Sequence, residues 1–267
     1  MELRYIIDEN ITLKEFVYRK ISRNFYGYLK EHEVIYTVNG NVTKSYEQLH
    51  VGDELVITYQ EEKKENGILN DSPLDILYED EHYIVVDKPY NLQSIPSKGN
   101  PYDSLYNRLL YYFKDSNNTV HLINRLDKET KGLVLIAKSN YSRAILKDFD
   151  KVYYATTKYK LPIDKGEINL PILKVDGTTK RIISPEGQKA ITLYELYKED
   201  NNLYTYKVIL NTGRTHQIRL HFSHLSSPLV NDSIYGLYEG GELGLLCGEI
   251  TFYNPIINKK IIVKSKY

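Results

Sequence analysis

The sequence predicts an α+β fold, in which a mixed, largely antiparallel β-sheet is flanked by helices and loops and is preceded by a small α/β module. First, apolar runs typical of buried strands follow helical segments in mixed order, not in strict alternation. Second, strand-like runs are separated by short polar turns, as in antiparallel hairpins. Third, 267 residues with 42% hydrophobic content can bury the core of one large domain, or of one large and one small domain.

Residues 61–73, EEKKENGILNDSP, form the expected boundary between two parts of the chain. They combine a charge run with turn-forming residues and show no apolar period, which is typical of a linker. We therefore predict a module over residues 1–60 and a larger domain over residues 74–267.

The module is expected to contain a helix followed by short strands. Apolar side chains recur near helical spacing over residues 13–31, and the strand-like runs VIYTVNG and HVGDELVITY follow. Basic residues on the helical segment alternate with acidic ones, so the pattern fits a solvated face as well as an RNA-binding face. The basic residues are Arg19, Lys20, Arg23 and Lys30.

The larger domain is expected to mix strands with three helices. Strands are predicted within 76–89, at 133–138 and at 151–159, and a long hairpin is predicted from 191–200 and 203–211, turning at Asn201 and Asn202. Helices are predicted after a cap at Asp103 or Ser104, from Ser139, and after a cap at Thr215.

Composition narrows the class of protein. The 35 basic and 35 acidic residues cancel, so net charge does not indicate a nucleic-acid partner, although a local basic cleft remains compatible with one. One cysteine, Cys247, excludes an internal disulfide and the usual cysteine-rich zinc sites. The start lacks the character of a secretory signal, and no apolar run reaches the length of a membrane span. We expect a cytoplasmic monomer.

A dense polar cluster, RLDKETKG at 125–132, stands directly before the apolar run LVLIA. One interpretation is a charged connection into a core strand, because loops are commonly polar. The other is that Asp127 is a catalytic carboxylate held at the end of a rigid strand. A second cluster, TGRTHQIRLH at 212–221, favours the second interpretation, since Arg214, His216 and Arg219 could grip phosphate or balance a buried carboxylate.

These clusters, with KVYYA between them, resemble the RluA-type RNA pseudouridine synthases. The resemblance covers nearly all of residues 74–267 through ordered motifs: ILYEDEHYIVVDKP, NRLDKETKGLVLIAK, KVYYA, TGRTHQIRLHFSHLSSPLVNDSIYG and LLCGEITFYNPI. Residues 1–60 more loosely resemble the S4 RNA-binding module that often precedes this domain. The resemblance implies isomerisation of uridines in rRNA or tRNA, without metal or cofactor.

Individual site residues follow from the same resemblance. Asp127 matches the essential aspartate, and Arg125 the arginine that fills the gap left by the flipped nucleotide. Tyr153 matches the active-site tyrosine, and Arg219 the arginine that pairs with the aspartate. Ile218 and Leu220 flank that arginine and are expected in the apolar wall of the pocket, while Arg214 and His216 are expected to bind substrate.

The chemistry fits these residue types. Uridine becomes pseudouridine when the bond from C1′ to N1 breaks, the base rotates, and a bond from C1′ to C5 forms. A carboxylate near C1′ would attack it or assist abstraction of a ribose proton, and the residues leave both routes open. A neighbouring guanidinium favours the charged carboxylate. The target base must leave its helix, at a cost of roughly a few kcal/mol.

Four positions depart from the family pattern, and two rival functions remain. Asn124, Lys131, Asn231 and Cys247 stand where His, Ser, Gly and His are usual, which bears on substrate choice and local backbone geometry. One rival is a metal-dependent hydrolase using His216, His221 and His224. The other is a non-catalytic RNA-binding protein on the same fold.

Overall fold

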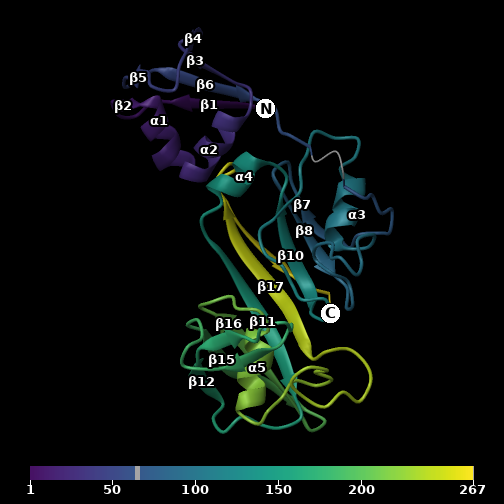
Figure 1. Ribbon diagram of the computed structural model, residues 1–267. Helices are drawn as coiled ribbons and strands as arrows, with labels where there is room; N and C mark the ends of the chain where they lie inside the picture. Colours follow the sequence, from purple (N-terminus) through teal and green to yellow (C-terminus); the bar gives the residue numbers. More distant parts are fainter. Residues whose placement is uncertain (64–66, 267) are drawn as a thin grey trace.

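The computed structural model describes residues 1–63 and 67–266, and Figure 1 shows two bodies built around separate sheets. The centre of the predicted linker, residues 64–66, lies outside the described residues, as does residue 267. Residues 1–59 contain a four-stranded sheet in the order β1-β6-β3-β4, with helices against it, among the residues that are described. Its elements are β1 (Glu2–Ile6), β2 (Ile11–Thr12), α1 (Leu13–Phe16), η1 (Val17–Ile21), α2 (Arg23–Glu31), β3 (Val34–Val38), β4 (Asn41–Thr43), β5 (Gln48–Leu49) and β6 (Glu54–Tyr59).

The second body is organised by a ten-stranded sheet, counted over the described residues. Its main path runs β12-β15-β16-β11-β17-β10-β8-β7, and β18 and β9 pair with β17 and β10. Each of its described strand pairs is antiparallel except that of β10 with β17, so the α+β prediction is confirmed. The strands of this sheet are β7 (Ile76–Glu79), β8 (Tyr83–Lys88), β9 (His121–Leu122), β10 (Lys131–Ala137), β11 (Phe149–Thr157), β12 (Lys165–Asn169), β15 (Ile191–Asp200), β16 (Leu203–Leu210), β17 (Leu245–Asn254) and β18 (Lys259–Lys264). A separate pair is formed by β13 (Ile172–Lys174) and β14 (Arg181–Ile183).

The centre of this sheet is covered on both faces. All six residues of β8 and six of the seven residues of β10 are buried, which explains the apolar runs YIVV and LVLIA in their sequences. Strand β17 was not among the predicted strands, yet it lies between β11 and β10 and joins the two halves of the sheet.

The predicted hairpin of β15 and β16 is confirmed. Its two-residue turn places Asn201 and Asn202 at φ values of 49° and 60°. Two successive left-handed residues define the turn type whose twist matches that of the flanking strands, and asparagine tolerates this conformation well.

Three helices accompany this sheet in the described part of the chain: α3 (Leu105–Tyr112), α4 (Asn140–Ile145) and α5 (Gln217–His224). Ser104 and Ser139 cap the first two, as predicted, by accepting hydrogen bonds from backbone N–H groups three residues later. The predicted cap at Thr215 is wrong. Helix α5 begins one residue later, after His216, which lies in the left-handed region at φ 58° and makes no side-chain cap.

The two bodies share an apolar contact at α4, which lies beside α2 (Figure 1). Ile145 of α4 is buried in the core of the N-terminal body, and the Tyr5 hydroxyl donates to that of Tyr141 at 2.8 Å. Glu61 accepts hydrogen bonds from the backbone and side-chain nitrogens of Asn140, at 2.8 and 3.0 Å. The N-terminal body is therefore packed onto the larger one.

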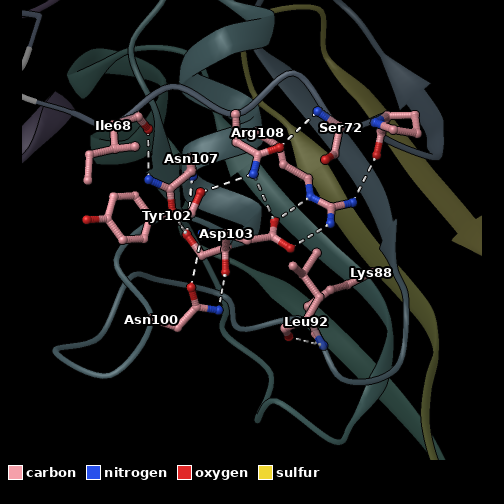
Figure 2. A network of polar contacts seen from close by, with 12 residues as sticks. Ile68, Ser72, Lys88, Leu92, Asn100, Tyr102, Asp103, Asn107 and Arg108 are labelled. Carbon is pink, nitrogen blue, oxygen red and sulfur yellow. Dashed lines mark hydrogen bonds and ion pairs between the residues drawn. The ribbon is translucent and has the colours of Figure 1, made fainter.

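The second half of the predicted linker is tied to α3 by a polar network (Figure 2). Asn107 donates to the carbonyl of Ile68 at 2.8 Å, and Arg108 donates to the carbonyl of Pro73 at 3.2 Å. Arg108 also binds both carboxylate oxygens of Asp103, at 2.9 and 3.1 Å. These contacts fix the end of the linker against α3.

We predict that Gly132→Ala destabilises the protein by more than about 2 kcal/mol. Gly132 lies at φ 110°, which L-residues rarely adopt, and an added Cβ would overlap the backbone carbonyl of Cys247 on β17. Urea unfolding measures the effect. Gly99→Ala is the control, because nothing lies within 4 Å of its added Cβ. Equal stability of the two variants would contradict the prediction.

Candidate active site

A pocket of about 620 Å³ lies where three parts of the second body meet: the loop before β10, strand β11, and the loop leading into α5. It contains seven of the eight predicted site residues, although they come from distant parts of the sequence. These seven are Arg125, Asp127, Tyr153, Arg214, His216, Ile218 and Arg219. A fourth wall, residues 93–97, had not been assigned from the sequence.

The loop that carries Asp127 is anchored from beneath. Lys88, a fully buried residue at the end of β8, donates to the carbonyls of Leu92 at 2.7 Å and of Lys128 at 3.3 Å. Burial lowers the pKa of Lys88 to about 7, and the negative charge of Asp127 acts in the opposite direction. The Asp127 side chain itself is 37% exposed and so remains accessible from the pocket.

Tyr153 lies in the floor of the pocket on β11. Burial, more than any other cause, raises its pKa well above the ordinary value, and the neighbouring Cys247 and Asp127 add to the effect. Tyr153 is hydrogen-bonded to the Cys247 thiol, whose own pKa burial raises to about 12. Both groups are therefore neutral at physiological pH. Lys151 lies two residues before Tyr153 on the same strand and also lines the pocket.

Gln217 shapes the loop before α5. Its side-chain oxygen accepts the backbone N–H of Arg214 at 3.0 Å and the hydroxyl of Thr212 at 2.9 Å, while its nitrogen donates to the carbonyl of Ile191 at 2.9 Å. This buried amide holds Arg214 and His216 at the mouth of the pocket.

Arg219 lines the pocket, but the expected pair with Asp127 is wrong. Its Nε and Nη2 donate to the two carboxylate oxygens of Asp232, at 2.9 and 2.6 Å, and Nη2 also lies 2.9 Å from Glu129 Oε2. Asp232 is fully buried and accepts the backbone N–H groups of Ile234 and Tyr235 as well. Because this carboxylate is pre-oriented, Asp232 is the bidentate partner of Arg219, in place of the pair with Asp127 that the resemblance implied.

His216 is the basic side chain that faces Asp127, with Nε2 3.9 Å from Oδ2. Burial is the main cause that lowers the pKa of His216, although Asp127 raises it. Its Nδ1 lies 3.0 Å from the hydroxyl of Tyr235, which also accepts the backbone N–H of Arg181 at 2.9 Å. The phenolic proton is therefore free to point to Nδ1, which leaves the proton of a neutral imidazole on Nε2, facing the pocket.

Leu220 does not line the pocket, so its predicted place in the apolar wall is wrong. It packs with Ile172 and Ala190 in a separate small core. Residues two apart on a helix point in nearly opposite directions. Ile218 therefore faces the pocket while Leu220 faces away.

The histidine set of the hydrolase alternative is not arranged for a metal. His221 is fully buried, and its two ring nitrogens contact the hydroxyl of Thr192 at 2.9 Å and the carbonyl of Leu170 at 3.0 Å. Both nitrogens are thus occupied by protein groups. No group of three metal-binding side chains is found within the described ranges.

The four departures from the family pattern have local partners. Asn124 bonds the backbone of Leu133 and Leu135 on β10, at 3.1 and 2.8 Å. Asn231 lies at φ 55°, a conformation in which asparagine is among the best tolerated residues after glycine. Lys131 pairs with Glu242 at 2.6 Å, and Cys247 contacts Tyr153.

Some site residues escaped prediction although the sequence carried a signal for two of them. Lys88 and its neighbour Asp87 are charges at the end of an apolar run, and Lys151 shares its strand face with Tyr153. Asp232 and Tyr235 lie in the motif TGRTHQIRLHFSHLSSPLVNDSIYG, but their contacts with Arg219 and His216 form only in the fold and could not be predicted from it.

Comparison with known proteins identifies the family. Residues 82–224 match the model of the RNA pseudouridylate synthase family. The dual-specificity RNA pseudouridine synthase RluA of Vibrio cholerae is 34% identical over 68% of this chain and 78% of its own length. The ribosomal large subunit pseudouridine synthase D of Pseudomonas aeruginosa is 32% identical over 79% of this chain and 68% of its own.

A solved structure agrees on the fold. Human RNA pseudouridylate synthase domain containing 1 superposes with a TM-score of 0.59 at 19% identity, over 74% of this chain and 85% of that one. No helix in the described part of this chain is both long and apolar enough to span a membrane. The family-model match and the identity to RluA and its relatives show that this chain belongs to the RluA-type RNA pseudouridine synthases.

Proposed function

We propose that this enzyme isomerises a uridine of large-subunit ribosomal RNA, with Asp127 as the essential carboxylate. One observation carries the proposal: Asp127, Tyr153 and the basic groups at 214 and 216 converge on one pocket of about 620 Å³. That volume is in the range of ligand pockets and suits a nucleotide. The relative in Pseudomonas aeruginosa, which is named for the large ribosomal subunit, supports the choice of RNA.

The charge of the pocket suits RNA although the net charge of the chain is zero. Among the described residues, five lysines and arginines line it, against one carboxylate, that of Asp127. The five are Arg125, Lys128, Lys151, Arg214 and Arg219. Such a local excess attracts phosphates independently of the total charge.

Asp127 acts at the ribose of a flipped uridine. Its carboxylate attacks C1′ or assists removal of a ribose proton while the bond to N1 breaks. The base then rotates, C5 bonds to C1′, and the hydrogen of C5 leaves as a proton. Tyr153 offers a flat, neutral ring for the freed uracil, and Ile218 adds an apolar wall. Arg125, which is exposed at the rim, fills the space that the nucleotide leaves.

Arg219 acts indirectly in this scheme. It binds Glu129, two residues beyond Asp127, and is itself held by Asp232. The charge of Arg219 also interacts with that of Asp127. We assign it to positioning the Asp127 loop and to long-range stabilisation of the carboxylate.

We further propose that residues 1–60 are an S4-like RNA-binding module. Arg19 on η1 and Arg23 at the start of α2 are exposed, close together in sequence and available to phosphates. The shared core at α4 holds this surface at a fixed position relative to the catalytic body.

Asp127→Asn is expected to bind RNA normally and to release no tritium from RNA labelled at C5 of uridine. The amide keeps the shape of the side chain but cannot act as a nucleophile or base. Tritium release reads the reaction directly, because forming the new bond expels that hydrogen. Asp148→Asn, which changes an exposed carboxylate between α4 and β11, is the control and should retain full activity. Release by Asp127→Asn at the wild-type rate would refute the assigned role.

Asp232→Asn is expected to lower the free energy of unfolding by about 3 to 5 kcal/mol at pH 7, because it leaves the buried guanidinium of Arg219 without its main partner. Hydrogen bonds and the Arg219 charge outweigh burial and lower the pKa of Asp232. Its contribution is therefore complete above the unfolded pKa, near 4, and is lost as the pH falls through the lower folded value.

Urea unfolding at several pH values measures this difference between wild type and Asp232→Asn. Asp8→Asn removes an exposed partner of Lys20 and should leave stability unchanged. A wild-type stability for Asp232→Asn at neutral pH would show that the buried pair does not hold this region.

Arg19→Ala and Arg23→Ala are each expected to lower the slope of log affinity against log salt concentration by about 1, as removal of one phosphate contact does. Filter binding to ribosomal RNA over a salt series measures the slope. Lys20→Ala is the matched control, since its ammonium already pairs with Asp8 at 3.0 Å and Glu9 at 3.8 Å. Unchanged slopes in both arginine variants would place RNA binding elsewhere.

A further inference from the structure

The wall formed by residues 93–97 does more than line the pocket, because one of its side chains grips the loop of Asp127. Ser94 is 5% exposed, and its hydroxyl donates to the carbonyl of Leu126 at 2.6 Å. The same oxygen accepts the backbone N–H of Leu126 at 3.0 Å. One hydroxyl therefore satisfies both backbone groups of the residue that separates Arg125 from Asp127.

We propose that Ser94 is a positioning residue that sets the place of Asp127 for catalysis. Leu126 is itself buried, at 6% exposure, so neither of its backbone groups would find water if the hydroxyl were removed. The loop lacks regular hydrogen bonding at this point, since it connects β9 to β10. Without Ser94 the Leu126 peptide would shift to find other partners, and Asp127 would move with it.

Ser94 can serve as a fixed point because its own backbone is anchored. The carbonyls of Gln93 and Ser94 accept the N–H groups of Leu105 and Tyr106, at 2.8 and 3.2 Å. These are the first two amides of α3, which have no partner inside the helix. Helix α3 is in turn fixed by the network of Asn107 and Arg108 (Figure 2). A continuous chain of contacts thus runs from α3 through Ser94 to Asp127.

The position of Ser94 also distinguishes it from the other anchors of the loop. Lys88 binds the carbonyl of Lys128, and Glu129 is held by Arg219, so both act after Asp127 in the chain. Ser94 binds the backbone of Leu126, the residue directly before Asp127. Asn124 holds the loop further upstream, through the backbone of Leu133 and Leu135, so the Ser94 hydroxyl is the side-chain anchor nearest to Asp127 on that side.

This inference rests on the proposed function. Two measurements distinguish a failure of the inference from a failure of the proposed function. Amide hydrogen exchange of Leu126, followed by NMR, tests the grip itself and needs no RNA. Single-turnover tritium release from ribosomal RNA labelled at C5 of uridine tests its catalytic consequence.

Ser94→Ala is expected to speed the exchange of the Leu126 N–H by at least about tenfold and to lower the turnover rate by about 10- to 100-fold, as small displacements of reacting groups do. The affinity for RNA should stay within about threefold, because the Ser94 hydroxyl is buried and bonded to the Leu126 backbone, and the basic side chains of the pocket are unchanged. Ser94→Thr keeps the hydroxyl and should recover most of the rate.

Ser139→Ala is the matched control. Ser139 is also buried, and its hydroxyl also bonds a backbone N–H, that of Ser142 at 3.0 Å, but it caps α4 away from the pocket. Its loss should lower the melting temperature without changing the turnover rate. A Ser94→Ala variant that keeps the wild-type rate, or that loses rate only in proportion to Ser139→Ala, would overturn the inference.

Failure of the proposed function would look different. Wild type would then release no tritium from any ribosomal RNA fraction, and the catalytic part of the inference would fall with it. Unchanged Leu126 exchange in Ser94→Ala would overturn the inference even if wild type were fully active.

Discussion

The site depends on holding an irregular loop still at the edge of a buried sheet. A strand is fixed by hydrogen bonds to its neighbouring strands. The loop around Asp127 must expose a carboxylate and lies outside the strands, so it lacks these bonds. Buried polar groups from other segments hold the loop instead, namely the ammonium of Lys88, the hydroxyl of Ser94 and the guanidinium of Arg219 acting through Glu129. Each is costly to bury alone, and each has at least one of its partners in the loop. The same contacts therefore stabilise the fold and define the geometry of the reaction.

In the described part of the chain, the ion pairs of the site leave the carboxylate of Asp127 outside any bidentate pair with an arginine. The strongest cation of the pocket, Arg219, is balanced by the fully buried Asp232 and by Glu129. What faces Asp127 at 3.9 Å is His216, whose pKa is lowered mainly by burial. A carboxylate locked into a bidentate pair would have to break it before meeting a ribose. Here the buried bidentate pair of Arg219 is made with Asp232, and Asp127, the proposed reacting group, stays outside it.

Much of the fold and part of the site could be predicted from local patterns, and the failures have physical causes. The Asn201 and Asn202 turn and the caps at Ser104 and Ser139 follow from short-range chemistry, and all agree with the structure. The motifs and their order also identified seven residues that line one pocket in the structure. The partner of Arg219 could not be predicted, because several carboxylates compete for it and only tertiary packing decides between them. The prediction that Leu220 lines the pocket is wrong for a simpler reason: Ile218 and Leu220 both flank Arg219 in the sequence but lie on different faces of the helix.

The apolar contact between the two bodies has a consequence for which RNA shapes can reach both of them. When two binding modules are joined by a flexible tether, the gain from the second contact depends on tether length through an effective concentration. Here Ile145 and the Tyr5–Tyr141 hydrogen bond set the separation instead. If residues 1–60 bind RNA, as proposed above, the enzyme favours RNAs whose folded shape presents a uridine and a distant phosphate group at that fixed spacing. Three-dimensional form would then contribute to the selection of the substrate.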